Sequence, residues 1–240
     1  MNEYKKLIGD LHSHTIVSGH AYGTIRENAQ AAADIGLEIL GITEHGPGIP
    51  GTCDPFYFCN LKAIPRELYG VKIMIGCEIN VLNEGKLSLD QRWIDRLDYG
   101  IAGIHLLCYK DCGKEGNTEN LLSCMKNEKI KIVSHPDDDH TPLDYEKIAI
   151  AAKEYGVALE VNNSSLLKPD HRINCFENYK TMLEWCEKTG TMIVIDSDAH
   201  DPSAVGRTDK AFELVKQYNF PEEQILNNDL HKILRFMGKE

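Results

Sequence analysis

The chain has 240 residues, of which 42% are hydrophobic and 26% charged, a composition typical of globular proteins and not of disordered ones. Its 26 Lys and Arg residues face 37 Asp and Glu residues, so the formal net charge is −11. Such a chain is a poor match for long nucleic acids or anionic membranes, since both require a basic surface. No apolar run approaches the ~18 residues of a membrane span, and the first residues, MNEYKKLIGD, contain no secretory leader. We expect a cytoplasmic protein that does not bind membranes.

Eight cysteines are scattered over the chain without a C-x-x-C pair. In a cytoplasmic protein such residues are mostly buried, reduced thiols, so we expect neither a disulfide framework nor a thiolate zinc site. No linker, low-complexity tract or change of composition divides the sequence. A single domain over residues 1–240 is therefore expected.

Short β-branched segments alternate with helix-period segments along the chain. The expected strands are Leu7–Leu11, Glu38–Thr43, Val71–Cys77, Tyr99–Ile104, Ile130–Ser134, Val157–Val161 and Met192–Asp196. The expected helices are Thr24–Ile35, Asn117–Asn127, Leu143–Tyr155, Cys175–Thr189 and Ala204–Tyr218, followed by a closing helical cap over Glu222–Met237. Gly36, Gly70, Gly156 and Gly190 stand shortly before strands, where a left-handed C-cap residue is favoured.

This alternation predicts an α/β protein whose strands pair in parallel through right-handed crossovers. An open doubly wound sheet and a closed barrel both satisfy the pattern. The first strand, however, is followed by His12 and His14 rather than by a glycine-rich phosphate loop. We therefore favour a barrel with its site at the C-terminal ends of the strands.

Histidines concentrate where the expected strands end. Five of the ten follow five different strands within a few residues, namely His14, His45, His105, His135 and His200. Because the C-terminal ends of the strands meet at one mouth of a parallel barrel, we expect these imidazoles to lie together.

Carboxylates accompany the histidines. His12 and His14 share one face of a strand by its period of two, and Asp198 lies two residues before His200. Glu78 directly follows an apolar strand, where a carboxylate is costly unless cations surround it; a rim glutamate in a salt bridge is the alternative. Nitrogen and oxygen ligands without thiolates suit zinc, manganese or iron. Their number predicts two or three ions, and such clusters usually activate water for phosphoryl transfer.

Eight motifs carry a resemblance that covers nearly the whole chain. They read DLHSHT (10–15), HAYGT (20–24), GITEHGP (41–47), GCEINV (76–81), GIH (103–105), SHP (134–136), EVNNSS (160–165) and DSDAH (196–200). The sequence resembles the polymerase-and-histidinol-phosphatase (PHP) superfamily, and more narrowly its YcdX-like phosphatase branch. The resemblance implies a distorted seven-stranded (β/α)7 TIM-like barrel that holds three divalent metal ions, usually Zn²⁺, with Mn²⁺ or Fe as alternatives.

The resemblance also implies how nine ligands share three ions. The implied sets are His12, His14, Glu78 and Asp198 for one ion, Glu78, His105 and His135 for a second, and His20, His45 and His200 for the third. Among these ligands, we assign the catalytic role to Glu78, Asp198 and His200.

Two loops bear on the substrate. The loop after the sixth strand contains His171 and Arg172 beside Lys168, and we weigh a phosphate clamp against a solvent-exposed basic turn. The acidic run at 137–139 follows His135 and is unexpected beside an anionic substrate. We expect this run to point away into solvent.

Together these features predict a metal-dependent phosphoric monoester hydrolase acting on a small phosphorylated substrate. The alternatives are a phosphodiesterase or nuclease on small nucleotides, a metallo-amidohydrolase and a non-catalytic metal-binding module. Long nucleic acid is disfavoured as a partner by the charge of −11. The sequence leaves a homo-oligomer open.

Overall fold

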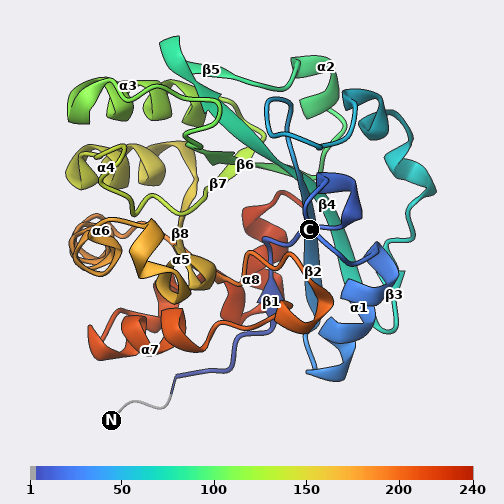
Figure 1. Cartoon of the computed structure of the whole chain (residues 1–240). Coiled ribbons are helices and arrows are strands. Elements are labelled where there is room, and N and C mark those ends of the chain that lie inside the picture. Colours follow the sequence, from blue (N-terminus) through green and yellow to red (C-terminus); the bar gives the residue numbers. More distant parts are fainter. Residues whose placement is uncertain (1–3, 240) are drawn as a thin grey trace.

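The computed structural model describes residues 4–239 and contains a curved sheet of parallel strands surrounded by helices (Figure 1). In sheet order the parallel strands are β1 (Gly9–Asp10), β2 (Ile39–His45), β4 (Val71–Leu82), β6 (Tyr99–Gly103), β7 (Ile130–Val133), β8 (Ala158–Asn162) and β9 (Ile193–Asp196). Two short antiparallel strands, β3 (Glu67–Leu68) and β5 (Lys86–Leu87), pair with β4. The seven expected strands and the barrel class are confirmed.

The barrel is nearly closed between its first and last strands. An isolated bridge joins Ser13 to Ala199, and the side chain of Asn227 spans the rest of the seam. Its amide nitrogen donates to the carbonyl oxygens of Gly9 (2.9 Å) and Ile195 (2.6 Å), and its Oδ1 accepts from the Ile195 N–H (3.2 Å). Asn227 thus satisfies backbone groups that a paired strand would satisfy.

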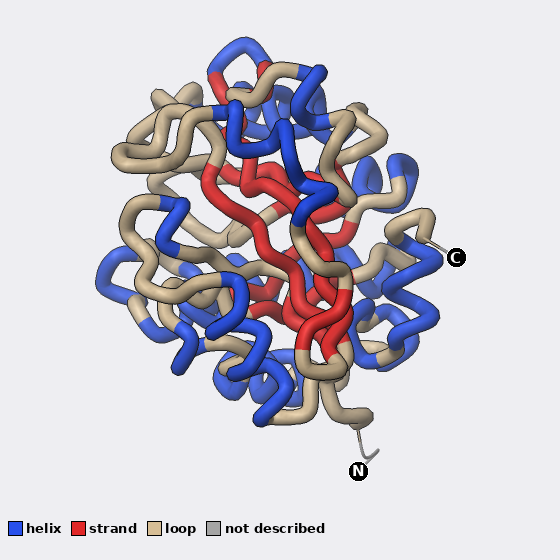
Figure 2. The backbone as a smooth tube through the Cα atoms, turned by 90° about the vertical axis from the view of Figure 1, so that its right-hand side faces the viewer, coloured by secondary structure: helices blue, strands red, loops and turns tan. Residues whose placement is uncertain are grey.

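Helices lie outside the strands, as the view turned by 90° shows (Figure 2). The α-helices are α1 (Ile25–Asp34), α2 (Gln91–Ile94), α3 (Gly113–Met125), α4 (Tyr145–Tyr155), α5 (Asn163–Leu167), α6 (Cys175–Thr189), α7 (Asp209–Gln217) and α8 (Leu230–Phe236). The 3₁₀ helices are η1 (Ile16–Ser18), η2 (Pro55–Ala63), η3 (Asn83–Gly85), η4 (Pro169–His171), η5 (Pro202–Ala204), η6 (Glu222–Gln224) and η7 (Leu226–Asn228).

Local sequence signals set several helix ends. Thr24 and Glu27 form a capping box at the start of α1, which satisfies two otherwise unpaired N–H groups. Gly156 (φ +65°) and Gly190 (φ +71°) end α4 and α6 in the left-handed conformation, as their positions in the sequence indicate.

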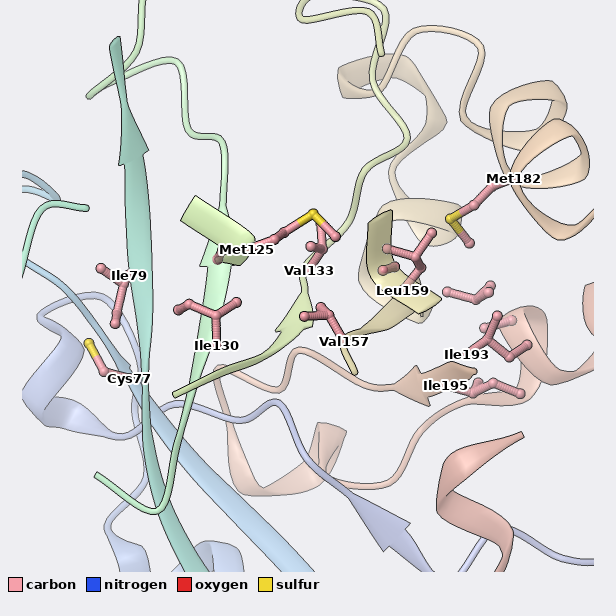
Figure 3. Close-up of a cluster of buried hydrophobic side chains, with 14 of the residues drawn as sticks. Cys77, Ile79, Met125, Ile130, Val133, Val157, Leu159, Met182, Ile193 and Ile195 are labelled. Atoms are coloured by element: carbon pink, nitrogen blue, oxygen red, sulfur yellow. The ribbon is translucent and has the colours of Figure 1, made fainter. Parts of the chain in front are cut away.

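Two apolar cores hold these layers together. The outer core lies between strands and helices, where Met125 and Met182 reach toward strand residues such as Ile130 and Leu159 (Figure 3). The inner core fills the barrel with inward-facing residues such as Tyr99, packed with residues of α8 and its flanks. These inner residues stand at the N-terminal ends of the strands, so α8 closes that end and leaves the opposite end for polar residues.

Several boundaries differ from the expectation; helix α3, for example, begins at Gly113 rather than at Asn117. Strand β4 continues to Leu82 rather than ending at Cys77, because Val81 and Leu82 pair with β5, so Glu78 lies within a strand and not after one. Helix α7 begins at Asp209, since residues 202–206 form a separate turn. The closing cap consists of two 3₁₀ turns and α8.

All eight cysteines are free thiols, as expected. Within residues 4–239, none of the helices combines the length and the apolarity needed to cross a membrane.

Candidate metal centre

Nine side chains converge at the C-terminal ends of the strands, opposite α8. They are the nine candidate ligands of the sequence analysis: His12, His14, His20, His45, Glu78, His105, His135, Asp198 and His200. Most are buried, while His20 is exposed and His105, Asp198 and His200 are partly exposed. The expected convergence of histidines from different strands is thus observed.

Glu78 lies at the middle of the cluster and is fully buried. Its Oε1 is 2.9 Å from Nε2 of His135 and 3.2 Å from Nε2 of His105. Its Oε2 is 2.9 Å from Nδ1 of His45 and 3.3 Å from Nε2 of His12. Sheet register explains part of this arrangement, because His45 of β2 stands directly opposite Glu78 of β4.

His12, His14 and Asp198 form a second group beside Glu78. The two Nε2 atoms of His12 and His14 are 3.1 Å apart, and Oδ1 of Asp198 is 3.3 Å from Nε2 of His14. Two ligands of a tetrahedral ion with bonds of about 2.0–2.1 Å lie roughly 3.3 Å apart. The spacing of these atoms therefore matches ligands of one ion.

The remaining histidines stack beside this group. Nε2 of His20 is 3.2 Å from Nε2 of His200, and the ring of His45 stacks on those of His14 (4.1 Å between centroids) and His20 (4.9 Å). Three sets of ligand atoms lie within 4.8 Å of one another: His14, His45 and His200; His12, His14 and Asp198; His45, Glu78 and His105. His14 and His45 each belong to two of these sets, so the three sets overlap.

The chemistry of this donor set fits a metal centre. Oε2 of Glu78, Oδ1 of Asp198 and Nδ1 of His45 are buried and make no hydrogen bond of acceptable geometry within residues 4–239. Each nevertheless lies 2.9–3.6 Å from other ligand atoms. Buried polar atoms that face one another without hydrogen bonds are costly. A cation shared between them removes that cost.

The surroundings shift four of the ligands toward the forms that bind metals and shift His12 the other way: although burial opposes it, the carboxylates of Glu160 and Glu78 raise the pKa of His12 well above its usual value. Although burial favours the neutral acids, the surrounding histidines hold the pKa of Glu78 and of Asp198 well below the usual range. Burial and the neighbouring His45 lower the pKa of His14, while burial and Arg172 lower that of His135. Ionised carboxylates and neutral imidazoles are the forms that bind metals.

Two of the ligands have an unusual backbone. His135 (φ +31°) and Asp198 (φ +53°) adopt positive φ although neither is glycine. Such conformations are costly and concentrate at functional sites, where the surrounding structure enforces them. Both residues lie two positions past the end of a strand, β7 for His135 and β9 for Asp198, and both side chains belong to the cluster.

Two residues that sequence reasoning missed orient the imidazoles. Glu160, fully buried in β8, has Oε1 2.7 Å from Nδ1 of His12, and its Oε2 accepts from the backbone N–H of His135 (2.7 Å). Oδ1 of Asn80 is 2.7 Å from Nδ1 of His105. These contacts leave the Nε2 atoms of both rings free for a metal. The sequence feature that could have revealed Glu160 is its position as the single carboxylate among the apolar residues of strand β8.

Asp196, the last residue of β9, is fully buried. Its Oδ1 accepts from the N–H of Leu11 (2.7 Å).

The two substrate candidates lie differently. Nη1 of Arg172 is 3.1 Å from Oδ1 of Asp137, which is fully buried two residues after His135, so the Arg172 guanidinium lies at the edge of the cluster. His171 is exposed on η4. The expectation that the acidic run points into solvent is wrong: Asp138 accepts from the N–H of Ile173 (3.1 Å), and residues 137–139 are tied to the segment 172–178.

Comparisons with known proteins match the chain to one family. The model described as "PHP domain" matches residues 10–239. A protein of Clostridium acetobutylicum named "probable phosphatase" is 39% identical over 233 residues, which is 97% of this chain and 95% of that protein. Another protein of that name, from Thermoanaerobacter sp., is 39% identical over 237 residues, which is 98% of this chain and 96% of the relative.

Solved structures share the fold at lower identity. The histidinol phosphate phosphatase of Lactococcus lactis, complexed with zinc, L-histidinol and phosphate, has a TM-score of 0.58 and 20% identity over 89% of this chain and 94% of that chain. A chain of archaeal ribonuclease P with mature tRNA has a TM-score of 0.61 and 14% identity, and the match covers 95% of this chain and 90% of that one. These two likenesses support the fold alone.

Proposed function

We propose, from the premise that the chain belongs to the PHP domain family, that it is a metal-dependent phosphoric monoester hydrolase acting on a small phosphorylated substrate. The observation that carries the proposal is the cluster around buried Glu78, in which three buried ligand atoms, Oε2 of Glu78, Oδ1 of Asp198 and Nδ1 of His45, face other ligands without a hydrogen bond within residues 4–239. The "probable phosphatase" relatives, which match nearly the whole chain, support the reaction class.

The nine residues would hold three divalent ions, with zinc the first candidate because the ligands are imidazoles and carboxylates. Glu78 reaches histidines on both sides through its two oxygens, which suits a bridging carboxylate. When bound, such ions lower the pKa of water and neutralise phosphate oxygens. The histidinol phosphate phosphatase of L. lactis, which binds zinc and phosphate, supports this choice.

The chain's own residues supply the rest of the site. Glu160 and Asn80 fix the rings of His12 and His105. Arg172 lies beside His135 and donates one N–H to Asp137. A guanidinium has further N–H groups, so Arg172 can bind a phosphate oxygen while Asp137 holds it in place.

The proposal is tested by metal content and turnover of the purified protein. After removal of metals with a chelator and reloading with Zn²⁺ or Mn²⁺, we expect hydrolysis of p-nitrophenyl phosphate to exceed that of bis(p-nitrophenyl) phosphate. His12→Asn should lower both metal content and turnover. His231→Asn is the matched control, because His231 is exposed on α8 at the opposite end of the barrel.

Faster hydrolysis of the diester would favour a phosphodiesterase instead. A metal-loaded protein that hydrolyses neither ester, nor any member of a panel of sugar phosphates, nucleotides and phospho-amino acids, would refute the phosphatase assignment.

A further inference from the structure

A pocket adjoins the metal centre. It has a volume of about 280 Å³, and Asp198 and His200 form part of its wall. Ligand sites usually measure about 300–1,000 Å³, so this pocket suits a group of a few carbon atoms. If the phosphate of a substrate binds at the metal cluster, the leaving group attached to its ester oxygen would extend into this adjoining pocket.

The walls of the pocket are tied to each other and to the cluster. Asn162, the N-cap of α5, donates to Oδ2 of Asp198 (3.3 Å). Asn163 lies on one wall, and its Oδ1 accepts from the N–H groups of Lys210 (2.9 Å) and Ala211 (3.1 Å) in α7. These hydrogen bonds fix α5 against α7, so this wall of the pocket has a defined position.

The loop after His200 is equally fixed. The N–H of Gly206 donates to the buried carboxylate of Asp10 (2.8 Å). Gly206 has φ +69°, a backbone conformation that favours glycine. The next residue, Arg207, is held by its own N–H, which donates to Ala204 (3.0 Å).

Two cations line this pocket beside an apolar surface. Lys168 and Arg207 contribute the charges, while Tyr22 and Leu167 are exposed by 77% and 48%. Within residues 4–239, the guanidinium of Arg207 makes no hydrogen bond or ion pair. Two carboxylates share the pocket: Asp198, a candidate metal ligand, and Asp201, which accepts from the N–H and the hydroxyl of Ser203.

We propose that this pocket receives the leaving group of the substrate and that Lys168 and Arg207 select leaving groups with an anion, either a carboxylate or a second phosphate. The inference rests on the proposed function, because it assumes that the phosphate binds at the metal centre. It deepens that function by naming the substrate class: small phosphomonoesters with a second negative charge. A cationic leaving group is disfavoured there.

Matched substrates test the selection. In the first pair, 3-phosphoglycerate has a carboxylate in its leaving group and glycerol 3-phosphate does not. In the second pair, a diol bisphosphate has a second phosphate that the diol monophosphate lacks. Phosphoethanolamine supplies a cationic leaving group. A charge-assisted hydrogen bond predicts a kcat/KM about tenfold higher for at least one of the two anionic leaving groups than for its neutral match. Arg207→Gln and Lys168→Gln should each lower that ratio. Arg96→Gln is the control, since exposed Arg96 lies just before β6, at the other end of the barrel.

Binding without turnover separates this inference from the proposed function. Calorimetric titration of the metal-loaded protein with 3-phosphonopropionate and with 3-hydroxypropylphosphonate should give about tenfold tighter binding of the former. That preference should disappear in Arg207→Gln. If the protein binds 3-phosphonopropionate more tightly but hydrolyses none of the esters, the proposed phosphatase activity is refuted while the anion-binding pocket is supported. Equal kcat/KM values within each matched pair, equal binding of the two phosphonates, or ratios unchanged in Arg207→Gln would overturn the anion site.

Discussion

Glu160 offers a direct test of how the chain prepares its ligands. The carboxylate is fully buried, and each oxygen faces donors: Nδ1 of His12 at 2.7 Å on one side, and the N–H of His135 (2.7 Å) with Nδ2 of Asn162 (3.0 Å) on the other. The substitution Glu160→Gln keeps the shape but replaces one oxygen with an NH₂ group. Whichever way the amide turns, that NH₂ faces a donor.

The size of the effect follows from these contacts. A buried donor left without an acceptor costs about 1–3 kcal/mol, and outer contacts of metal-bound histidines typically contribute 10- to 100-fold in metal affinity. Because a factor of ten in affinity corresponds to about 1.4 kcal/mol, the free-energy cost of the unpaired donor and the expected loss of metal affinity are of similar size. We expect Glu160→Gln to weaken the tightest Zn²⁺ site by roughly 10- to 100-fold, because His12 is no longer fixed with Nε2 toward the ion.

Competition between the metal-free protein and a chromophoric chelator measures this affinity. Glu187→Gln is the matched control, because it removes the same charge from an exposed position near the end of α6. The reasoning is refuted if Glu160→Gln binds Zn²⁺ within about twofold of the wild type while remaining folded, well below the loss that such contacts predict.

Three further changes test the ligands, the phosphate contact and the fold. Glu78→Gln should lose roughly one metal equivalent and nearly all turnover, since one carboxylate serves ligands on both sides; full metal content by elemental analysis would contradict the bridging role. Arg172→Ala, combined with Asp137→Asn to avoid an unpaired buried carboxylate, should lower kcat/KM about 10- to 100-fold without changing metal content, and unaltered kinetics and phosphate inhibition would remove Arg172 from the site. Asn227→Ala should lower the free energy of unfolding by about 2–4 kcal/mol in urea titrations, because three hydrogen bonds across the barrel seam disappear; a loss below about 0.5 kcal/mol would show that the seam does not depend on this side chain.

The sequence by itself determined the strands, most of the helices and the nine candidate ligands. Apolar periodicity is a local property, and a parallel barrel brings all strand ends to one mouth. Residues such as His105 and His135, which lie two positions past the ends of strands, could therefore be placed without coordinates. Boundaries that depend on pairing were less accessible: β4 extends past Glu78 because of its contact with β5.

Only the tertiary structure decided what surrounds those ligands. Glu160 meets His12 across 148 residues of chain, Asp137 meets Arg172 across 35, and Asn227 spans the seam between Gly9 and Ile195. Such partners leave no periodic signal, because each contact depends on sheet register and on the direction in which a loop returns. The sequence therefore indicates the candidate metal ligands, while the groups that contact them and line the pocket beside them depend on the folded chain.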